Sequence, residues 1–241
     1  MQKLKRSLGL LETTFYGVGV IVGAGIYALI GKAAGLAGNM VWLAFGIGAL
    51  IAAFTGLSYA ELSSMFPRAG GEYVYLKNAF NRRLAFLIGW LIVFGGVVTA
   101  ATVALGFSGY FSAIFHTPLI PIALVLICLL SFLNFWGIRE SAIANIIATI
   151  VELVGLVLVV VFGLKYFGSV DYTALPPLGL TGVLSATALI FFAYLGFEDI
   201  VRLSEETKNP KRTIPMALVL SIIISTVLYI SVAVAAVSVV G

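Results

Sequence analysis

Long apolar runs separated by short polar segments fill most of this sequence. A membrane-spanning helix needs about 20 apolar residues, and seven runs have that length: 10–35, 39–64, 83–114, 119–138, 142–167, 180–203 and 214–240. We expect all of them to be helices, because the strands of a membrane barrel give short alternating segments instead. The pattern therefore predicts an all-α polytopic membrane protein.

Composition and charge agree with that class. The 241 residues are 61% hydrophobic and 10% charged, whereas a soluble domain carries about 25% charged residues. All basic residues except Lys32 and Lys165 fall on one side of the alternating loops. The positive-inside rule then places the N-terminus in the cytoplasm. We expect a multi-pass protein of the cell membrane, whose net charge of +4 does not indicate nucleic acid binding.

The first apolar run contains a cluster of glycines, at positions 17, 19, 23 and 25. Glycine is the poorest ordinary helix former, and a helix that breaks in lipid leaves unpaired backbone groups at several kcal/mol each. Such a break is tolerated where protein or a polar cavity satisfies those groups, which favours a binding site inside the membrane. The alternative is helix packing, since Gly19 and Gly23 match the GxxxG pattern.

A second break is predicted near Leu195–Phe197 in the sixth run. There Gly196 is followed directly by the acidic pair Glu198 and Asp199, inside the span. Each break exposes the carbonyl end of one half-helix and the positive N–H start of the next. Two such breaks side by side can hold the ammonium and the carboxylate of an amino acid together.

Several motifs together resemble the amino acid–polyamine–organocation superfamily of permeases. Gly23–Tyr27 is similar to that family's Gly-Ser-Gly-Ile-Phe motif, with Ala24 and Tyr27 as departures. Residues 61–73 resemble its second helix and first cytoplasmic loop, and residues 192–215 resemble its sixth helix and the loop that follows. These segments occur in the family's order and spacing.

The resemblance implies the inverted-repeat fold shared with the leucine transporter, within one membrane domain, 1–241. Residues 1–167 would form the first repeat, helices one to five, and 180–240 would begin the second with helices six and seven. Helices one and six are the broken pair of this fold. Because the family has ten to twelve helices, three explanations stay open: a fragment of a longer chain, a chain completed by a second chain, or a miniature with another role.

The resemblance also implies the site. It places the substrate carboxylate at backbone amides and the ammonium at backbone carbonyls, with Phe192 as an aromatic gate over the substrate. The amides are those of Gly23, Ala24, Gly25 and Ile26, and the carbonyls are those of Val20, Ile21, Phe191, Phe192 and Tyr194. The family's serine hydroxyl is absent at Ala24, but the backbone contacts do not need it.

Two acidic residues inside the spans are further candidates. Glu152 lies midway along 142–167, where a carboxyl is neutral, paired or turned to a cavity. Proton-coupled relatives in the family carry a lysine at about this position, so we expect Glu152 either to couple protons or to make a structural hydrogen bond. Glu198 lies near the positive start of a half-helix, where capping and gating are both expected.

The resulting hypothesis is a secondary amino acid transporter that works by alternating access, with proton coupling or by exchange. Phe191, Phe192, Phe197, Val97 and Val98 are the expected cavity walls, and they favour small neutral or apolar amino acids before cationic ones. The alternative is an amino acid-binding membrane subunit or truncated permease that does not transport. No nucleophile–base constellation, Walker motif or metal-ligand cluster is recognisable in the sequence, so neither an enzyme nor a cofactor is expected.

Overall fold

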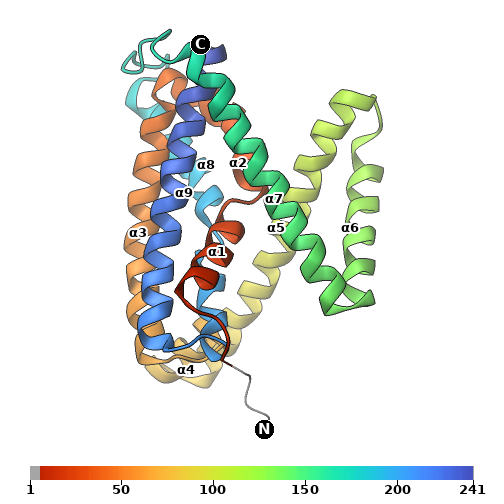
Figure 1. Ribbon diagram of the computed structural model, residues 1–241, viewed down its shortest axis with the longest axis vertical. Helices are drawn as coiled ribbons and strands as arrows, with labels where there is room; N and C mark the ends of the chain where they lie inside the picture. Colours follow the sequence, from red (N-terminus) through yellow and green to blue (C-terminus); the bar gives the residue numbers. More distant parts are fainter. Residues whose placement is uncertain (1–5, 241) are drawn as a thin grey trace.

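The computed structural model describes residues 6–240, except for the side chains of residues 138–143. The described part of the chain is built from α-helices and short 3-10 helices, with one isolated β-bridge between Leu8 and Thr207 (Figure 1). In chain order the elements are α1 (Leu10–Ile21), α2 (Ala24–Ala37), η1 (Gly38–Met40), α3 (Val41–Met65), α4 (Gly71–Ala79), α5 (Arg82–Phe115), α6 (Leu119–Trp136), α7 (Ile138–Gly163), η2 (Leu164–Tyr166), α8 (Gly179–Tyr194), η3 (Phe197–Glu205) and α9 (Pro210–Val240).

Helices of membrane-spanning length confirm the predicted class, an all-α polytopic membrane protein. Within the described residues, six helical stretches are long and apolar enough to cross a bilayer, and the shorter apolar helix α1 precedes them. One stretch, Ala24–Met65, includes both α2 and α3. The chain reverses direction between these two at η1, where Gly38 has a φ of 54° that favours glycine (Figure 1).

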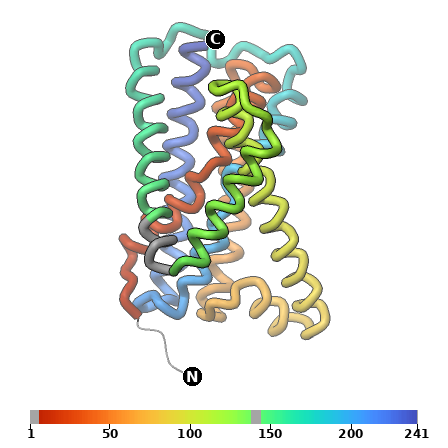
Figure 2. The backbone as a smooth tube through the Cα atoms, turned by 90° about the vertical axis from the view of Figure 1, so that its right-hand side faces the viewer, coloured from red at the N-terminus to blue at the C-terminus, as the bar shows by residue number. Residues whose placement is uncertain are grey.

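The two broken helices, α1 with α2 and α8 with η3, pack with α3 and α9 in one bundle. Large side chains from these helices are fully buried, among them Ile26, Phe45, Ile190 and Leu218. Helices α5 and α6 form a hairpin that leans away from this bundle (Figure 1). Helix α7 returns to α9 (Figure 2), and Gly163 there lies against Ala235.

The start of the last helix corrects the sequence-based expectation. The apolar run 214–240, with Thr213 before it and Pro215 near its start, predicts a helix capped by Thr213, but α9 begins earlier, at Pro210. The carbonyl of Asn209 accepts the first helical hydrogen bonds, from the amides of Arg212 and Thr213 at 3.0 Å. Proline suits the first helical position because the amide it lacks has no helical partner there.

Three backbone hydrogen bonds hold residues 7 and 8 against the segment that follows η3. The amides of Ser7 and Leu8 donate to the carbonyl of Glu206 at 2.9 and 3.1 Å, and the amide of Lys208 donates back to Leu8 at 2.8 Å. These bonds join the start of α1 to the end of η3. The sequence of residues 72–81, after the turn at Gly70 and Gly71, predicts a short helix, and α4 at the same end of the molecule confirms that helix (Figure 1). The expected cytoplasmic residues Lys3, Lys5 and the Arg139 side chain lie outside the described residues.

Close packing of α1 against α9 gives a first prediction. A Cβ added to Gly17 would overlap Ser221 Oγ and the end of the Ile200 side chain, whereas a Cβ on Gly31 of α2 would meet nothing within 4 Å. Gly17→Ala should therefore lower the free energy of unfolding by about 1–3 kcal/mol through overpacking. Gly31→Ala, the matched control, should leave it unchanged or raise it by up to about 1 kcal/mol. Thermal unfolding of the purified variants measures both, and equal shifts would contradict the packing described.

Candidate functional site

The first helix break lies at Val22 and Gly23, between α1 and α2. The amide of Val22 donates the last hydrogen bond of α1 to the carbonyl of Val18 at 2.8 Å, and the amide of Gly23 donates to the carbonyl of Ile21 at 2.8 Å. The next amides belong to the first turn of α2 and have no helical acceptor, because helical bonds start at the fourth residue. These amides are those of Ala24, Gly25 and Ile26.

The second break lies where it was predicted, in Leu195–Phe197. Helix α8 ends at Tyr194, Leu195 is extended, and Gly196 has a φ of 118° that side-chain-bearing residues rarely adopt. The amide of Gly196 donates to the Glu198 carboxylate at 2.8 Å. Glu198 thus caps η3, which is one of the two roles expected for it.

The two breaks touch each other through their backbones. A Cβ added to Gly25 would lie 2.9 Å from the Cα of Ala193, and one added to Gly196 would lie 2.9 Å from the carbonyl oxygen of Val20. The start of α2 therefore crosses the end of α8, while the end of α1 crosses the start of η3. Glycine is required at both positions because no side chain fits between the two crossing backbone segments.

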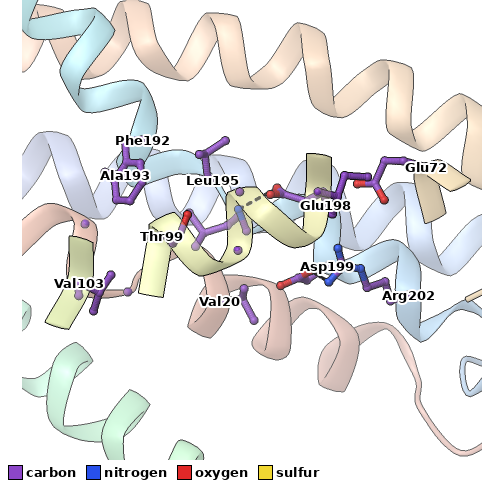
Figure 3. Close-up of a pocket in the computed structure, with 18 of the residues that line it drawn as sticks. Val20, Glu72, Thr99, Val103, Phe192, Ala193, Leu195, Glu198, Asp199 and Arg202 are labelled. Carbon is purple, nitrogen blue, oxygen red and sulfur yellow. Dashed lines mark hydrogen bonds and ion pairs between the residues drawn. The ribbon is translucent and has the colours of Figure 1, made fainter. Parts of the chain in front are cut away.

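A cavity of about 930 Å³ borders the crossed breaks and is closed on another side by α5 (Figure 3). Charged and aromatic residues line one part of it, and α5 supplies an apolar wall. Of the residues predicted for the site, seven line this cavity: Val20, Ile21, Gly23, Ala24, Gly25, Phe192 and Glu198.

The other predicted site residues are not in the lining. The side chains of Ile26 and Tyr194 are fully buried, and the Tyr194 hydroxyl donates to the carbonyl of Phe45 at 3.1 Å. Phe191 packs against the core. Glu152 lies on α7, where its backbone carbonyl accepts the Tyr27 hydroxyl at 2.5 Å. The roles predicted for these residues stay predictions.

The expected cavity walls are partly wrong. Val97 and Val98 are exposed side chains of α5 that do not line the cavity, and Phe197 is buried with its ring edge against Tyr59. The wall is formed instead by residues that recur every three or four positions on one face of α5, as helical geometry requires. They are Ile88, Ile92, Gly95, Thr99 and Val103, and the adjacent Val93 and Gly96 also line the cavity.

One end of the cavity is charged. Arg202 and Asp199 form an ion pair at 2.5 Å, and both appear beside Glu72 and Glu198 in Figure 3. Glu72 accepts the hydroxyl of Tyr59 at 3.0 Å. The sequence analysis missed Glu72 and Tyr59 as site residues. No local spacing in the sequence indicates that Glu72 of α4 reaches Tyr59 of α3.

A buried tyrosine of α4 lies near the acidic side chain of Glu72. Tyr75 of α4 is buried, and its hydroxyl has no partner among the described residues. Burial, together with the negative charge of Glu72, raises the pKa of Tyr75 to about 12. Its phenol is therefore protonated and neutral at physiological pH.

Comparison with known proteins identifies the family. A family model described as amino acid permease matches residues 8–241. The chain belongs to this amino acid permease family. The match confirms the resemblance to the amino acid–polyamine–organocation superfamily. The family and the relatives that the chain matches are transporters and not enzymes.

Relatives of this permease-family chain include several transporters. It is 32% identical to the branched-chain amino acid permease BcaP of Bacillus subtilis and 31% identical to the methylthioribose transporter of the same organism, each over 96% of this chain and 54% of the relative. It is 32% identical to human cationic amino acid transporter 4, over 94% of this chain and 40% of the relative. The chain thus spans about half the length of the curated relatives it matches.

The contact between the breaks gives a second prediction. Gly196→Ala should lower the free energy of unfolding by about 1–3 kcal/mol, because alanine is strained at a φ of 118° and its Cβ meets the Val20 carbonyl. Gly109→Ala in α5, whose Cβ would meet nothing within 4 Å, is the control and should not be destabilised. Thermal unfolding of the two variants checks this, and an undisturbed Gly196→Ala protein would show that the breaks do not touch.

Proposed function

We propose that this chain provides the amino acid-binding part of a secondary transporter, which moves its substrate by alternating access. The observation that carries the proposal is the pair of crossed helix breaks beside a cavity in a membrane protein. Breaks of this kind bring free amides and free carbonyls to one place, which suits the two charges of an amino acid. The family match and the printed names of the relatives support the same class of substrate.

The proposed site uses the backbone. The substrate carboxylate is held at the start of α2, where the positive end of the helix dipole favours an anion. The ammonium is held at carbonyls that end α1 and α8, and Phe192 closes over the substrate. Ala24 and Gly25 are the central amides of this proposal, because the amide of Gly23 already donates to Ile21.

The substrate class and the topology are part of the proposal. We expect neutral amino acids, since the α5 wall is apolar, and we place the N-terminus and α4 in the cytoplasm of a cell whose plasma membrane holds the protein. Residues 1–167 then form the first repeat of an inverted-repeat fold, and 180–240 begin the second. The cavity reaches Glu72 and Arg202, which supports an inward-facing state.

Removal of one amide tests the carboxylate site. Ala24 is the first residue of α2, and Gly23 before it is extended with φ −97° and ψ −162°, so proline fits at position 24 without breaking the helix. Ala24→Pro should weaken the binding of labelled leucine about tenfold to a hundredfold, because a hydrogen bond to a charged group contributes about 1.5–3 kcal/mol. Equilibrium binding to the purified protein in lipid nanodiscs measures the change.

Ala24→Val is the matched control, because it adds bulk at the same place and keeps the amide. Equal affinities of the two variants would mean that the amide does not bind the carboxylate. Arginine as a competitor tests the expected preference for neutral substrates. Absence of leucine binding to the unaltered chain would contradict the proposal itself, whereas binding without counterflow of label in proteoliposomes would favour a non-transporting subunit.

Proton coupling through Glu152 is the mechanistic part of the proposal. A carboxyl in the middle of a span can take up and release a proton as access alternates. In proteoliposomes, Glu152→Gln should abolish the response of leucine uptake to an imposed pH gradient while exchange of leucine continues. Glu61→Gln, at the exposed end of α3, should respond like the unaltered protein. A gradient response retained in Glu152→Gln would leave Glu152 a structural residue.

A further inference from the structure

A tyrosine on α9 contacts both helix breaks at once. The hydroxyl of Tyr229 lies 2.7 Å from the carbonyl oxygen of Ile21 and 2.9 Å from that of Ala193. Ile21 is the last residue of α1, and Ala193 is the residue before the last of α8. Tyr229 is itself fully buried and does not line the cavity.

One hydroxyl hydrogen serves two acceptors in this arrangement. A phenol donates a single hydrogen bond, and both carbonyls lie at the negative ends of half-helices. Ile21 has a second donor in the Gly23 amide at 2.8 Å. The hydrogen of Tyr229 can therefore shift between the two breaks, but only while both carbonyls stay within reach of the same oxygen.

The position of the hydroxyl is set by rigid packing. The ring of Tyr229 makes an edge contact with the ring of Tyr194 at 5.2 Å and a tilted contact with Phe45 at 5.6 Å. Two turns earlier on α9, the Ser221 hydroxyl donates to the carbonyl of Thr14 at 3.1 Å. Two hydroxyl groups of α9 thus bond to α1, and that of Tyr229 lies at the break.

We infer that Tyr229 is a positioning residue that joins the two helix breaks into one site. Its hydroxyl holds the carbonyl ends of α1 and α8 at a fixed separation, and so fixes the position of the neighbouring carbonyls that are proposed to bind a ligand's ammonium. The inference about ligand placement rests on the function proposed above, whereas the joining of the breaks does not.

Amide hydrogen exchange on Tyr229→Phe tests the joining of the breaks, because this variant removes the hydroxyl and keeps the ring. In nanodiscs, exchange should become about tenfold faster at both breaks, in residues 22–26 and 195–198, while the rest of α1 and α8 keeps its protection. Ser221→Ala is the matched control: it removes a buried hydroxyl of the same helix and should speed exchange only near Thr14.

Other patterns of exchange overturn the inference. Faster exchange at one break alone would mean that Tyr229 supports a single half-helix, and a uniform increase along the bundle would mean general stabilisation. If Tyr229→Phe does not fold, 3-fluorotyrosine at position 229 replaces it. Its more acidic hydroxyl is a stronger donor, so exchange should become slower at both breaks, and unchanged exchange would contradict the role.

Leucine binding to the same variants tests the positioning of the ligand. Tyr229→Phe should weaken binding about tenfold, and Ser221→Ala should not. Unchanged affinity despite faster exchange would overturn the positioning role. If the unaltered protein binds no leucine, the proposed function fails, but the exchange measurements still decide whether Tyr229 joins the breaks.

Discussion

The need to satisfy backbone groups inside a membrane governs the centre of this protein. Lipid offers no hydrogen bonds, so each N–H and C=O freed by a broken helix needs a partner from the chain or a polar cavity. Near the breaks the partners differ in kind: the amide of Gly196 has the Glu198 carboxylate, while the carbonyl of Ala193 has the Tyr229 hydroxyl. The first amides of α2 have no partner in their helix, and the cavity beside Ala24 and Gly25 is where a ligand can supply one.

Close backbone contact between the breaks follows from the same need. Two short half-helices can share one cavity only if their ends come together, and side chains at the crossing would hold them apart. Gly25 against Ala193 and Gly196 against Val20 give that approach. The glycines therefore serve two purposes: Gly23 and Gly196 lie where the helices are interrupted, and Gly25 and Gly196 allow the ends to meet.

Much of this arrangement was predictable from local sequence. Glycine clusters and an acidic residue inside apolar runs located both breaks, because helix propensity and the cost of buried charge act within a few residues. The pairing of Tyr59 with Glu72 and the contacts of Tyr229 were not predictable in this way, since they join helices far apart in the chain. The outward direction of Val97 and Val98 also depends on how α5 is rotated against the bundle, which its uniformly apolar sequence does not specify.

The departure from the family motif at Tyr27 acquires a physical meaning in the structure. Tyr27 lies in the first turn of α2, and its hydroxyl donates to the backbone carbonyl of Glu152 on α7. A Cβ on Gly155 would lie 2.6 Å from that hydroxyl, so the glycine leaves room for it. Phenylalanine has no hydroxyl and would make no such bond. The tyrosine therefore connects the backbone of α7 at Glu152 to the helix whose first residues line the cavity, so a shift of α7 at this position is passed directly to α2 beside the proposed site.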